Sequence, residues 1–223
     1  MKPMLLSAPD YLEFQLPDRG ACLVTDEGSP LTAQVVQRLS DQGWPVVILK
    51  FPPSLVRKST VSAEIRSVHL KTVEEGQMQM QLSAIAQAYG AIHTFIHLHP
   101  LEPVSDRGLI KTVFFLAKQL QPFLVQAERR ERRSFITVAR LDGELGLGDR
   151  PYPATSGGLF GLTKTLRLEW PTVFCRAIDI SPELSAVEAA NALIAEIHDP
   201  NLFIREVGYG RLGRVTLTSA DAV

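Results

Sequence analysis

Short apolar runs and helical stripes alternate along most of the chain. The apolar runs are short and rich in β-branched residues, as buried strands are. The stretches between them repeat apolar residues at the spacing of a helix that buries one face. We therefore predict strands at 21–25, 45–51, 67–70, 91–99, 134–139, 173–180 and 202–209, and helices at 31–43, 74–89, 105–128, 156–169 and 183–198. Residues 214–223 form either a last strand or a linker.

Two residues indicate where predicted helices end or bend. Gly43 follows the first helical stripe directly, at the position after a helix that glycine often occupies. Pro122 lies late in the helix at 105–128 and predicts a kink or an end there. Boundaries set in this way are accurate to about two to four residues.

The alternation of strands and helices specifies a fold class. Apolar strands separated by helices pair in parallel, with helices on both faces of the sheet. Right-handed crossovers then produce a doubly wound, mostly parallel, Rossmann-like α/β sheet. Ligands bind such sheets beyond the carboxyl ends of the strands.

The first twenty residues differ from the rest and predict an arm. They contain three prolines and one alternating segment at 11–16, in which Leu12, Phe14 and Leu16 are apolar. Period-two alternation indicates a half-buried strand, which docks either on this domain's own surface or on a neighbouring domain. The predicted organisation is an arm at 1–20, a Rossmann-like domain at 21–217 and a linker at 218–223.

Composition narrows the class of protein. The chain has 223 residues, of which 45% are hydrophobic and 21% charged, so it can bury a core. Its net charge of −1 argues against a nucleic-acid partner, since such proteins usually carry a basic excess. Cys22 and Cys175 each lie in an apolar run and predict two core thiols, as in a reducing compartment. Apolar stretches are too short for a membrane span, so we expect a cytoplasmic protein.

The turn after the first predicted strand is a poor phosphate site. A dinucleotide-binding turn needs several glycines and exposed backbone donors. Residues 25–32 retain only Gly28, and Asp26 and Glu27 place two negative charges where pyrophosphate would bind. Pro30 removes a further donor. The residues predict a structural turn that begins a helix.

The segment from Tyr152 to Trp170 is similar to the active-site helix of short-chain dehydrogenases/reductases. That family carries Tyr-x-x-x-Lys there, with a serine about thirteen residues upstream. The tyrosine matches Tyr152, but the lysine position holds Ser156 and the serine position holds Ala139, or Arg140 if the register shifts by one. The resemblance thus implies that Tyr152 is the one retained catalytic position. Without its lysine it is a vestigial or packing residue.

Longer phrases resemble a narrower family. GACLVTDEGSPLTAQVV, HTFIHLHP, SFITVARLDGELGLG and GGLFGLTKTLRLEWPTVFCRAIDIS are similar to the front half of ketoreductases in polyunsaturated fatty acid synthases and type I polyketide synthases. In that family the front half is a truncated structural subdomain, and the second half binds NADPH and reduces the β-ketoacyl group. The resemblance covers about residues 11–217.

This resemblance implies a non-catalytic subdomain that stabilises an adjacent NADPH-dependent β-ketoacyl reductase. No catalytic, cofactor-binding or metal-binding residue is expected in this chain, and its partners would be the catalytic ketoreductase subdomain and other synthase domains. One alternative is a stand-alone divergent reductase that uses Tyr152 with Lys164. Another is a docking scaffold with a degenerate Rossmann fold.

Two further groups of residues favour structural roles. His93, His97 and His99 lie on one predicted strand, but no acidic or cysteine ligand at a defined spacing completes a metal site. The run at 128–133 interleaves arginine with glutamate, which is typical of a solvated helix end rather than a nucleic-acid patch.

Overall fold

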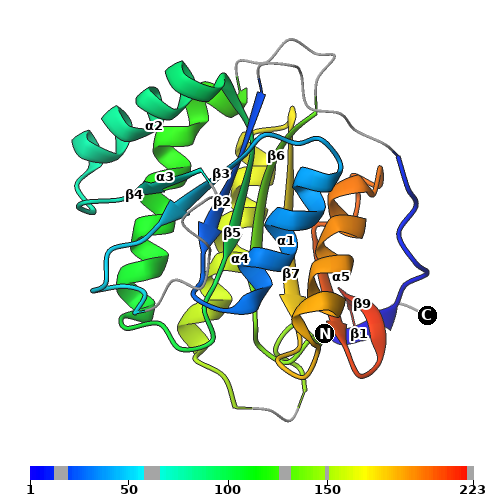
Figure 1. Cartoon of the computed structure of the whole chain (residues 1–223). Coiled ribbons are helices and arrows are strands. Elements are labelled where there is room, and N and C mark those ends of the chain that lie inside the picture. Colours follow the sequence, from blue (N-terminus) through cyan, green and yellow to red (C-terminus); the bar gives the residue numbers. More distant parts are fainter. Residues whose placement is uncertain (13–19, 58–65, 126–131, 149–150, 220–223) are drawn as a thin grey trace.

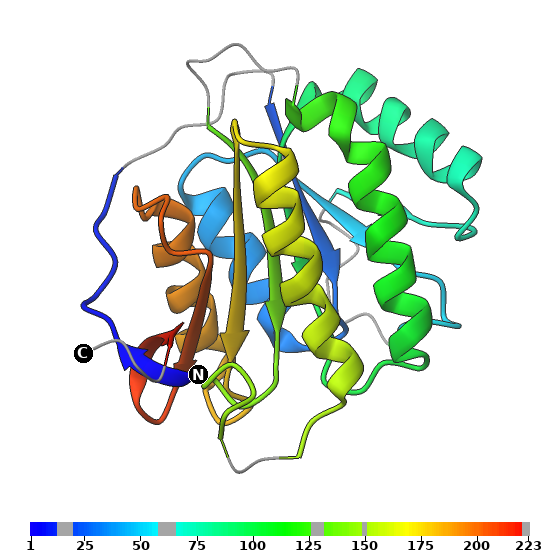
Figure 2. The same cartoon turned by 180° about the vertical axis from the view of Figure 1, so that it is seen from behind.

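The computed structural model describes residues 1–12, 20–57, 66–125, 132–148 and 151–219. They form one nine-stranded sheet with helices on both faces (Figures 1 and 2). The strands are β1 (Lys2–Leu5), β2 (Gly20–Asp26), β3 (Val46–Lys50), β4 (Ser67–His69), β5 (Ala91–Leu98), β6 (Arg133–Ala139), β7 (Val173–Ile180), β8 (Glu206–Gly210) and β9 (Gly213–Thr218). Their spatial order is β1-β9-β8-β7-β6-β5-β2-β3-β4.

The predicted fold class is confirmed. Strands β2 to β8 pair in parallel, whereas β9 and β1 add two antiparallel strands at one edge. The helices are α1 (Pro30–Asp41), α2 (Glu75–Tyr89), α3 (Asp106–Val125), α4 (Gly158–Glu169) and α5 (Ala186–His198), with a 3₁₀ turn η1 (Ala154–Gly157) before α4. Pro122 lies inside α3, and Gly43 has a left-handed φ of 80° just after α1.

Two hydrophobic cores lie on opposite faces of the sheet. One core joins the sheet to α2, α3 and α4 and includes Phe95, Phe135 and Trp170. The other joins it to α1 and α5 and includes Val35 and Leu193. Helices on both faces explain why the central strands are apolar throughout. No helix in the described residues is long and apolar enough to cross a bilayer.

The arm differs from the sequence prediction. Its described strand is β1, at Lys2–Leu5, which pairs antiparallel with β9. Tyr11 and Leu12 are not in a strand, and the rest of the predicted strand at 13–16 lies outside the described residues. Leu12 instead donates its N–H to the carbonyl of His198 at 3.0 Å, and the Tyr11 ring contacts the His198 ring at a tilt of 36°.

A buried ion network fastens the outer strands to α5. Arg176 of β7 pairs with Glu196 and, at 2.8 Å, with Asp199. Arg214 of β9 pairs with the same two carboxylates, each at 2.7 Å. Arg214 also donates to the carbonyl of Ser7 at 2.9 Å, so the network holds the arm as well.

The last parallel strand is shorter than predicted. The expected strand at 202–209 begins only at Glu206. Asn201 donates its N–H to the Asp199 side chain, and Phe203 donates its N–H to the Asn201 side chain, each at 2.9 Å. These side-chain bonds turn the backbone, which explains why the apolar residues there do not extend the strand.

Candidate functional site

The carboxyl ends of β2, β5, β6 and β7 meet at one end of the sheet, where an open α/β sheet binds ligands. Three loops converge on this end. They are the turn between β2 and α1, the segment after β5, and the loop after β6. The hydrogen bonds within these loops determine which ligands the site can bind.

The turn after β2 uses its own side chains to bind its backbone. Gly28 donates its N–H to Asp26 at 3.0 Å, and Ser29 donates its N–H to Glu27 at 3.1 Å. The N–H groups of Glu27 and Leu31 donate to the hydroxyls of Thr32 and Ser29, each at 3.2 Å. Four donors that could cradle a phosphate are therefore occupied within the turn.

The charge of this turn also opposes an anion. Asp26 and Glu27 are buried at the end of β2. Burial raises the pKa of Glu27 above its ordinary value, while hydrogen bonds from Ser29 and the charge of Arg140 oppose that rise. Pro30 provides no N–H at the start of α1. The residues of this turn do not fit the pyrophosphate of a dinucleotide.

A chain of buried polar groups fills the centre of the site. Thr25 hydrogen-bonds to His97 Nδ1 at 3.1 Å, and His97 Nε2 to His99 Nδ1 at 3.3 Å. His99 Nε2 lies 2.8 Å from Asp106 Oδ1, and the Ser156 hydroxyl donates to the same oxygen at 3.2 Å. The lysine position of the reductase family thus holds a serine that belongs to this buried chain.

The geometry of this chain is not that of a nucleophilic triad. In a triad the imidazole bridges the serine and the acid through opposite nitrogens. Here Ser156 and Asp106 both approach His99 Nε2, at 3.5 and 2.8 Å, while Nδ1 faces His97. Burial lowers the pKa of both histidines. The neighbouring His99 lowers the pKa of His97 further, whereas the hydrogen bond and charge of Asp106 oppose the lowering at His99. The two imidazoles relay hydrogen bonds between β2, β5 and α3.

Two aspartates organise the loop after β6. Asp179, at the end of β7, accepts from the N–H groups of Leu141 and Gly143, each at 2.8 Å, and of Leu145 at 2.9 Å. Asp142 accepts from the N–H groups of Glu144, Gly146 and Gly148 at 2.7 to 2.9 Å. Burial and a hydrogen bond with Asp142 raise the pKa of Asp179 to about 7. We call residues 141–148 the plug loop.

The plug loop lies directly on the backbone of β8. A Cβ added at Gly208 would overlap the carbonyl oxygen of Gly143, and one added at Gly143 would overlap Tyr209. Gly143 also has a left-handed φ of 78°. Glycine at both positions permits this close approach. The space beside the ends of β7 and β8 is therefore filled by the chain itself.

Tyr152 fastens the plug loop. Its hydroxyl donates to the carbonyl of Gly146 at 2.8 Å, and a Cβ at Gly146 would overlap that hydroxyl. Lys164, the proposed partner in a stand-alone reductase, pairs instead with Glu206 at 2.8 Å. Ala139, at the family's serine position, is buried at the end of β6 and has no hydroxyl. Arg140 donates to the carbonyl of Ile180 at 3.2 Å.

Replacing Tyr152 with phenylalanine should lower the free energy of unfolding by about 1 kcal/mol, the usual net contribution of one hydrogen bond. Urea unfolding measures the difference. Tyr89→Phe is the control, because the described contacts of Tyr89 involve its ring and not its hydroxyl. Equal stabilities of Tyr152→Phe and the wild type would contradict a fastening role.

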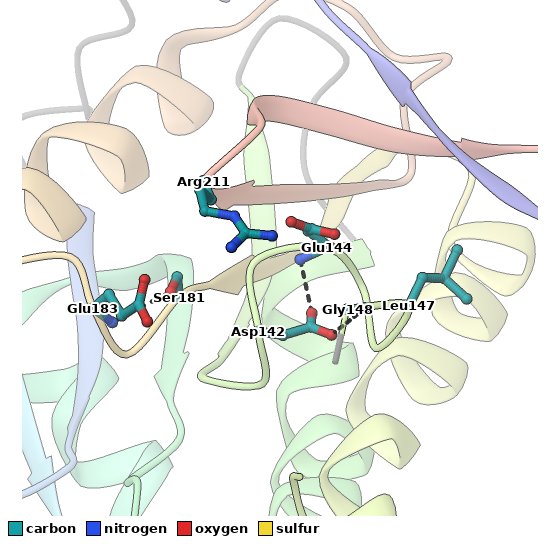
Figure 3. A pocket seen from close by; sticks show the side chains of 7 residues that line it. All are labelled: Asp142, Glu144, Leu147, Gly148, Ser181, Glu183 and Arg211. Carbon is teal, nitrogen blue, oxygen red and sulfur yellow. Dashed lines mark hydrogen bonds between the residues drawn. The ribbon is translucent and has the colours of Figure 1, made fainter. Parts of the chain in front are cut away.

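A small cleft remains beside the plug loop (Figure 3). It is lined by Asp142, Glu144, Leu147, Gly148, Ser181, Glu183 and Arg211. Figure 3 shows the Arg211 guanidinium directed toward Glu144 across its mouth. The Asp142 carboxylate is already bound to backbone N–H groups of the plug loop. The cleft therefore borders the plug loop, and its Asp142 carboxylate already accepts hydrogen bonds from that loop.

The cysteines and the remaining charged candidates occupy structural positions. Both cysteines are free and buried, as predicted. Burial raises the pKa of Cys175 to about 12 and that of Cys22 well above its ordinary value. Among the described residues, no group of three or more His, Cys, Asp or Glu side chains is arranged to hold a metal ion. Of the run at 128–133, residues 128–131 lie outside the described part, and Arg132 lies over the Phe174 ring.

Sequence reasoning identifies Ser156 and His99 but misses their common partner. Asp106, at the start of α3, carries no distinctive sequence signal, and neither do Asp142 and Asp179. An acidic residue at a helix start or in a glycine-rich loop is usually a solvated cap. Only the approach of α3 to both β5 and η1 shows that Asp106 binds both.

Proteins of known identity resemble this chain in sequence. No family model matches it. Over 211 residues it is 32% identical to a polyunsaturated fatty acid synthase subunit of Thraustochytrium sp., a match that covers 91% of this chain and 7% of that protein. It is also 26% identical over 223 residues to L-fucose dehydrogenase of Oryctolagus cuniculus, covering 90% of this chain and 76% of that enzyme. The chain therefore spans only a small part of the synthase relative.

Solved structures show the same fold. A short-chain dehydrogenase/reductase from Brucella melitensis matches with a TM-score of 0.62 at 16% identity, covering 87% of this chain and 95% of that one. A structure with the adenylation, ketoreductase and pseudo-Asub domains of a keto acid-selecting NRPS module matches with a TM-score of 0.68 at 14% identity. That match covers 96% of this chain and 18% of the other. The chain thus has the short-chain dehydrogenase/reductase fold and is homologous to a segment of a polyunsaturated fatty acid synthase.

Proposed function

We propose that this domain is a non-catalytic structural subdomain that stabilises an adjacent NADPH-dependent β-ketoacyl reductase in a polyunsaturated fatty acid or polyketide synthase. The observation that carries the proposal is the turn after β2. Its N–H groups at Glu27, Gly28, Ser29 and Leu31 all donate to side chains of the same turn. The pyrophosphate of NADPH would have to break these bonds and would lie beside the carboxylates of Asp26 and Glu27.

The catalytic positions support the same proposal. The family's lysine is replaced by Ser156, which is committed to Asp106, and its serine by Ala139. Tyr152 remains, but its hydroxyl donates to a backbone carbonyl. A phenol without a neighbouring cation is a poor proton donor in catalysis at neutral pH. On its own the domain would be no enzyme, and NADPH would bind only in the adjacent half.

The alternative of a stand-alone reductase depends on Tyr152 and Lys164 acting together. The ion pair of Lys164 with Glu206 and the hydrogen bond of Tyr152 to Gly146 direct the two groups to different partners. This geometry favours the structural role. In the docking-scaffold alternative the domain also acts by binding a protein. That alternative differs from the proposal only in which protein is bound.

The proposal is tested in the full synthase chain that would carry this domain. NADPH-dependent reduction of an acetoacetyl thioester is measured for the wild type, for a chain lacking this domain, and for the isolated domain. We expect no turnover by the isolated domain, and loss of reduction when the domain is deleted. Turnover by the isolated domain, or full reduction after its deletion, would overturn the proposal.

A further inference from the structure

Apolar side chains, of which Met4 and Phe203 are exposed, line a groove at the outer edge of the sheet. The groove lies over β1, β8 and β9 and is lined in part by Met4, Leu6, Phe203, Ile204 and Leu217. We call it the outer groove. Figure 2 shows α4 in front of the central strands, whereas β9 and β1 extend beyond it with no described helix in front.

Phe203 is the most exposed residue of this surface, and its backbone is tied by hydrogen bonds to the interior. Its side chain is 93% exposed, the highest value among the large hydrophobic residues described. Its N–H donates to the Asn201 side chain, and the Asn201 carbonyl accepts from buried Arg176. The N–H of Asn201 donates to Asp199 of the buried ion network. The backbone that carries this exposed ring is thus already fixed, so binding would not have to order that segment, although it would still order the ring.

The rim of the outer groove is polar and of mixed charge. Lys164 of α4 and Glu206 of β8 form an ion pair across one wall, and Arg205 adjoins them. Leu168 lies one helical turn beyond Lys164 and is 68% exposed. An apolar centre with a charged rim is typical of a protein interface. The mixed signs do not match the uniform charge of a nucleic acid.

We propose that the outer groove is the docking surface for the adjacent reductase domain, with Phe203 as its central anchor. This inference rests on the proposed function and adds the surface and the residue through which stabilisation acts. The matched segment is 7% of the synthase relative, so a domain of this kind has neighbours on the same chain. Tethering gives such a neighbour a millimolar effective concentration, for which a groove of modest size suffices.

The contact is made by side chains rather than by strand addition. β1 is the edge strand of the sheet, and Pro3 removes one backbone donor from it. Proline on an edge strand is a common protection against pairing with another strand. The partner therefore supplies an apolar surface that covers Phe203 and the neighbouring groove.

The test compares three substitutions in the full synthase chain. Phe203→Asp alters the proposed anchor, Phe114→Asp alters an exposed phenylalanine on α3, and Gly208→Ala disturbs the fold of this domain. Thioester reduction and the thermal midpoint of the reductase are measured for each. We expect Phe203→Asp to lower reduction by about tenfold, the scale of losing one anchor, and Phe114→Asp to leave it unchanged. The isolated Phe203→Asp domain should unfold in urea at the wild-type midpoint.

The outcomes separate the two proposals. If Gly208→Ala lowers reduction but Phe203→Asp does not, the surface is wrong and the supporting role stands. If none of the three lowers reduction, the proposed function itself fails. Sedimentation of the isolated domain tests the other occupant, because a dimer that Phe203→Asp dissociates would assign the groove to a second copy and overturn this inference.

Discussion

Replacing Glu196 with alanine is expected to lower the free energy of unfolding by about 3–5 kcal/mol, the usual cost of removing one partner from a buried ion pair. Glu196 is fully buried and binds both Arg176 and Arg214. It also accepts a hydrogen bond from the Tyr209 hydroxyl at 2.6 Å. Without Glu196, the two buried guanidinium groups retain Asp199 as the carboxylate that both bind. Urea unfolding of the isolated domain measures the loss.

Two variants show whether the loss comes from the network. Glu196→Gln keeps the shape and some hydrogen bonds but removes the charge, so its stability should lie between those of alanine and the wild type. Glu169→Ala removes an exposed carboxylate at the end of α4 and should change stability by less than about 0.5 kcal/mol. A Glu196→Ala protein as stable as Glu169→Ala would contradict the role given to this network.

Replacing Gly208 with alanine should cost about 1–3 kcal/mol or more, the range for overpacking a well-packed interior. The new Cβ would overlap the carbonyl oxygen of Gly143 and lie 3.0 Å from its carbonyl carbon. Backbone strain at residue 208 does not contribute, because Gly208 is not among the described residues with a left-handed φ. The loss therefore reports the contact between the plug loop and β8. Thermal and urea unfolding both measure it.

Gly161→Ala is the matched control for Gly208→Ala. Gly161 lies inside α4, and a Cβ there would meet no atom within 4 Å. Alanine is the better helix former, so this variant should gain about 0.5–1 kcal/mol. Opposite signs for the two substitutions are the expected result. A similar change in both would mean that the plug loop is not packed as described.

The fold follows closely from the sequence because its signals are local. The apolar run VFCRAIDI predicts β7 at its observed bounds, Val173–Ile180, and the stripe ending at Gly43 predicts α1 within two residues of its end. Each signal depends on the spacing of neighbouring apolar residues. The parallel pairing of the strands then follows from the alternation of strands and helices.

The interior of the site could not be predicted in the same way. The bond from Thr25 to His97 joins residues 72 positions apart, and that from Ser156 to Asp106 joins residues 50 apart. β1 escapes prediction because Lys2–Leu5 shows no alternation and contains a proline. Such contacts depend on which strands and helices become neighbours in the fold. No single stretch of the sequence specifies this arrangement. The turn after β2 could be recognised from the sequence as a poor phosphate site, because its residues follow one another in the chain.

The central claim is that this domain does not bind NADPH. Titration of the isolated domain with NADPH, monitored by calorimetry and by nicotinamide fluorescence, tests it most directly. The turn after β2 binds its own N–H groups and carries Asp26 and Glu27, so no saturable binding is predicted up to millimolar NADPH. Retained binding in a control reductase of the same fold shows that the assay detects the complex. Saturable binding by this domain with a micromolar Kd would contradict the account.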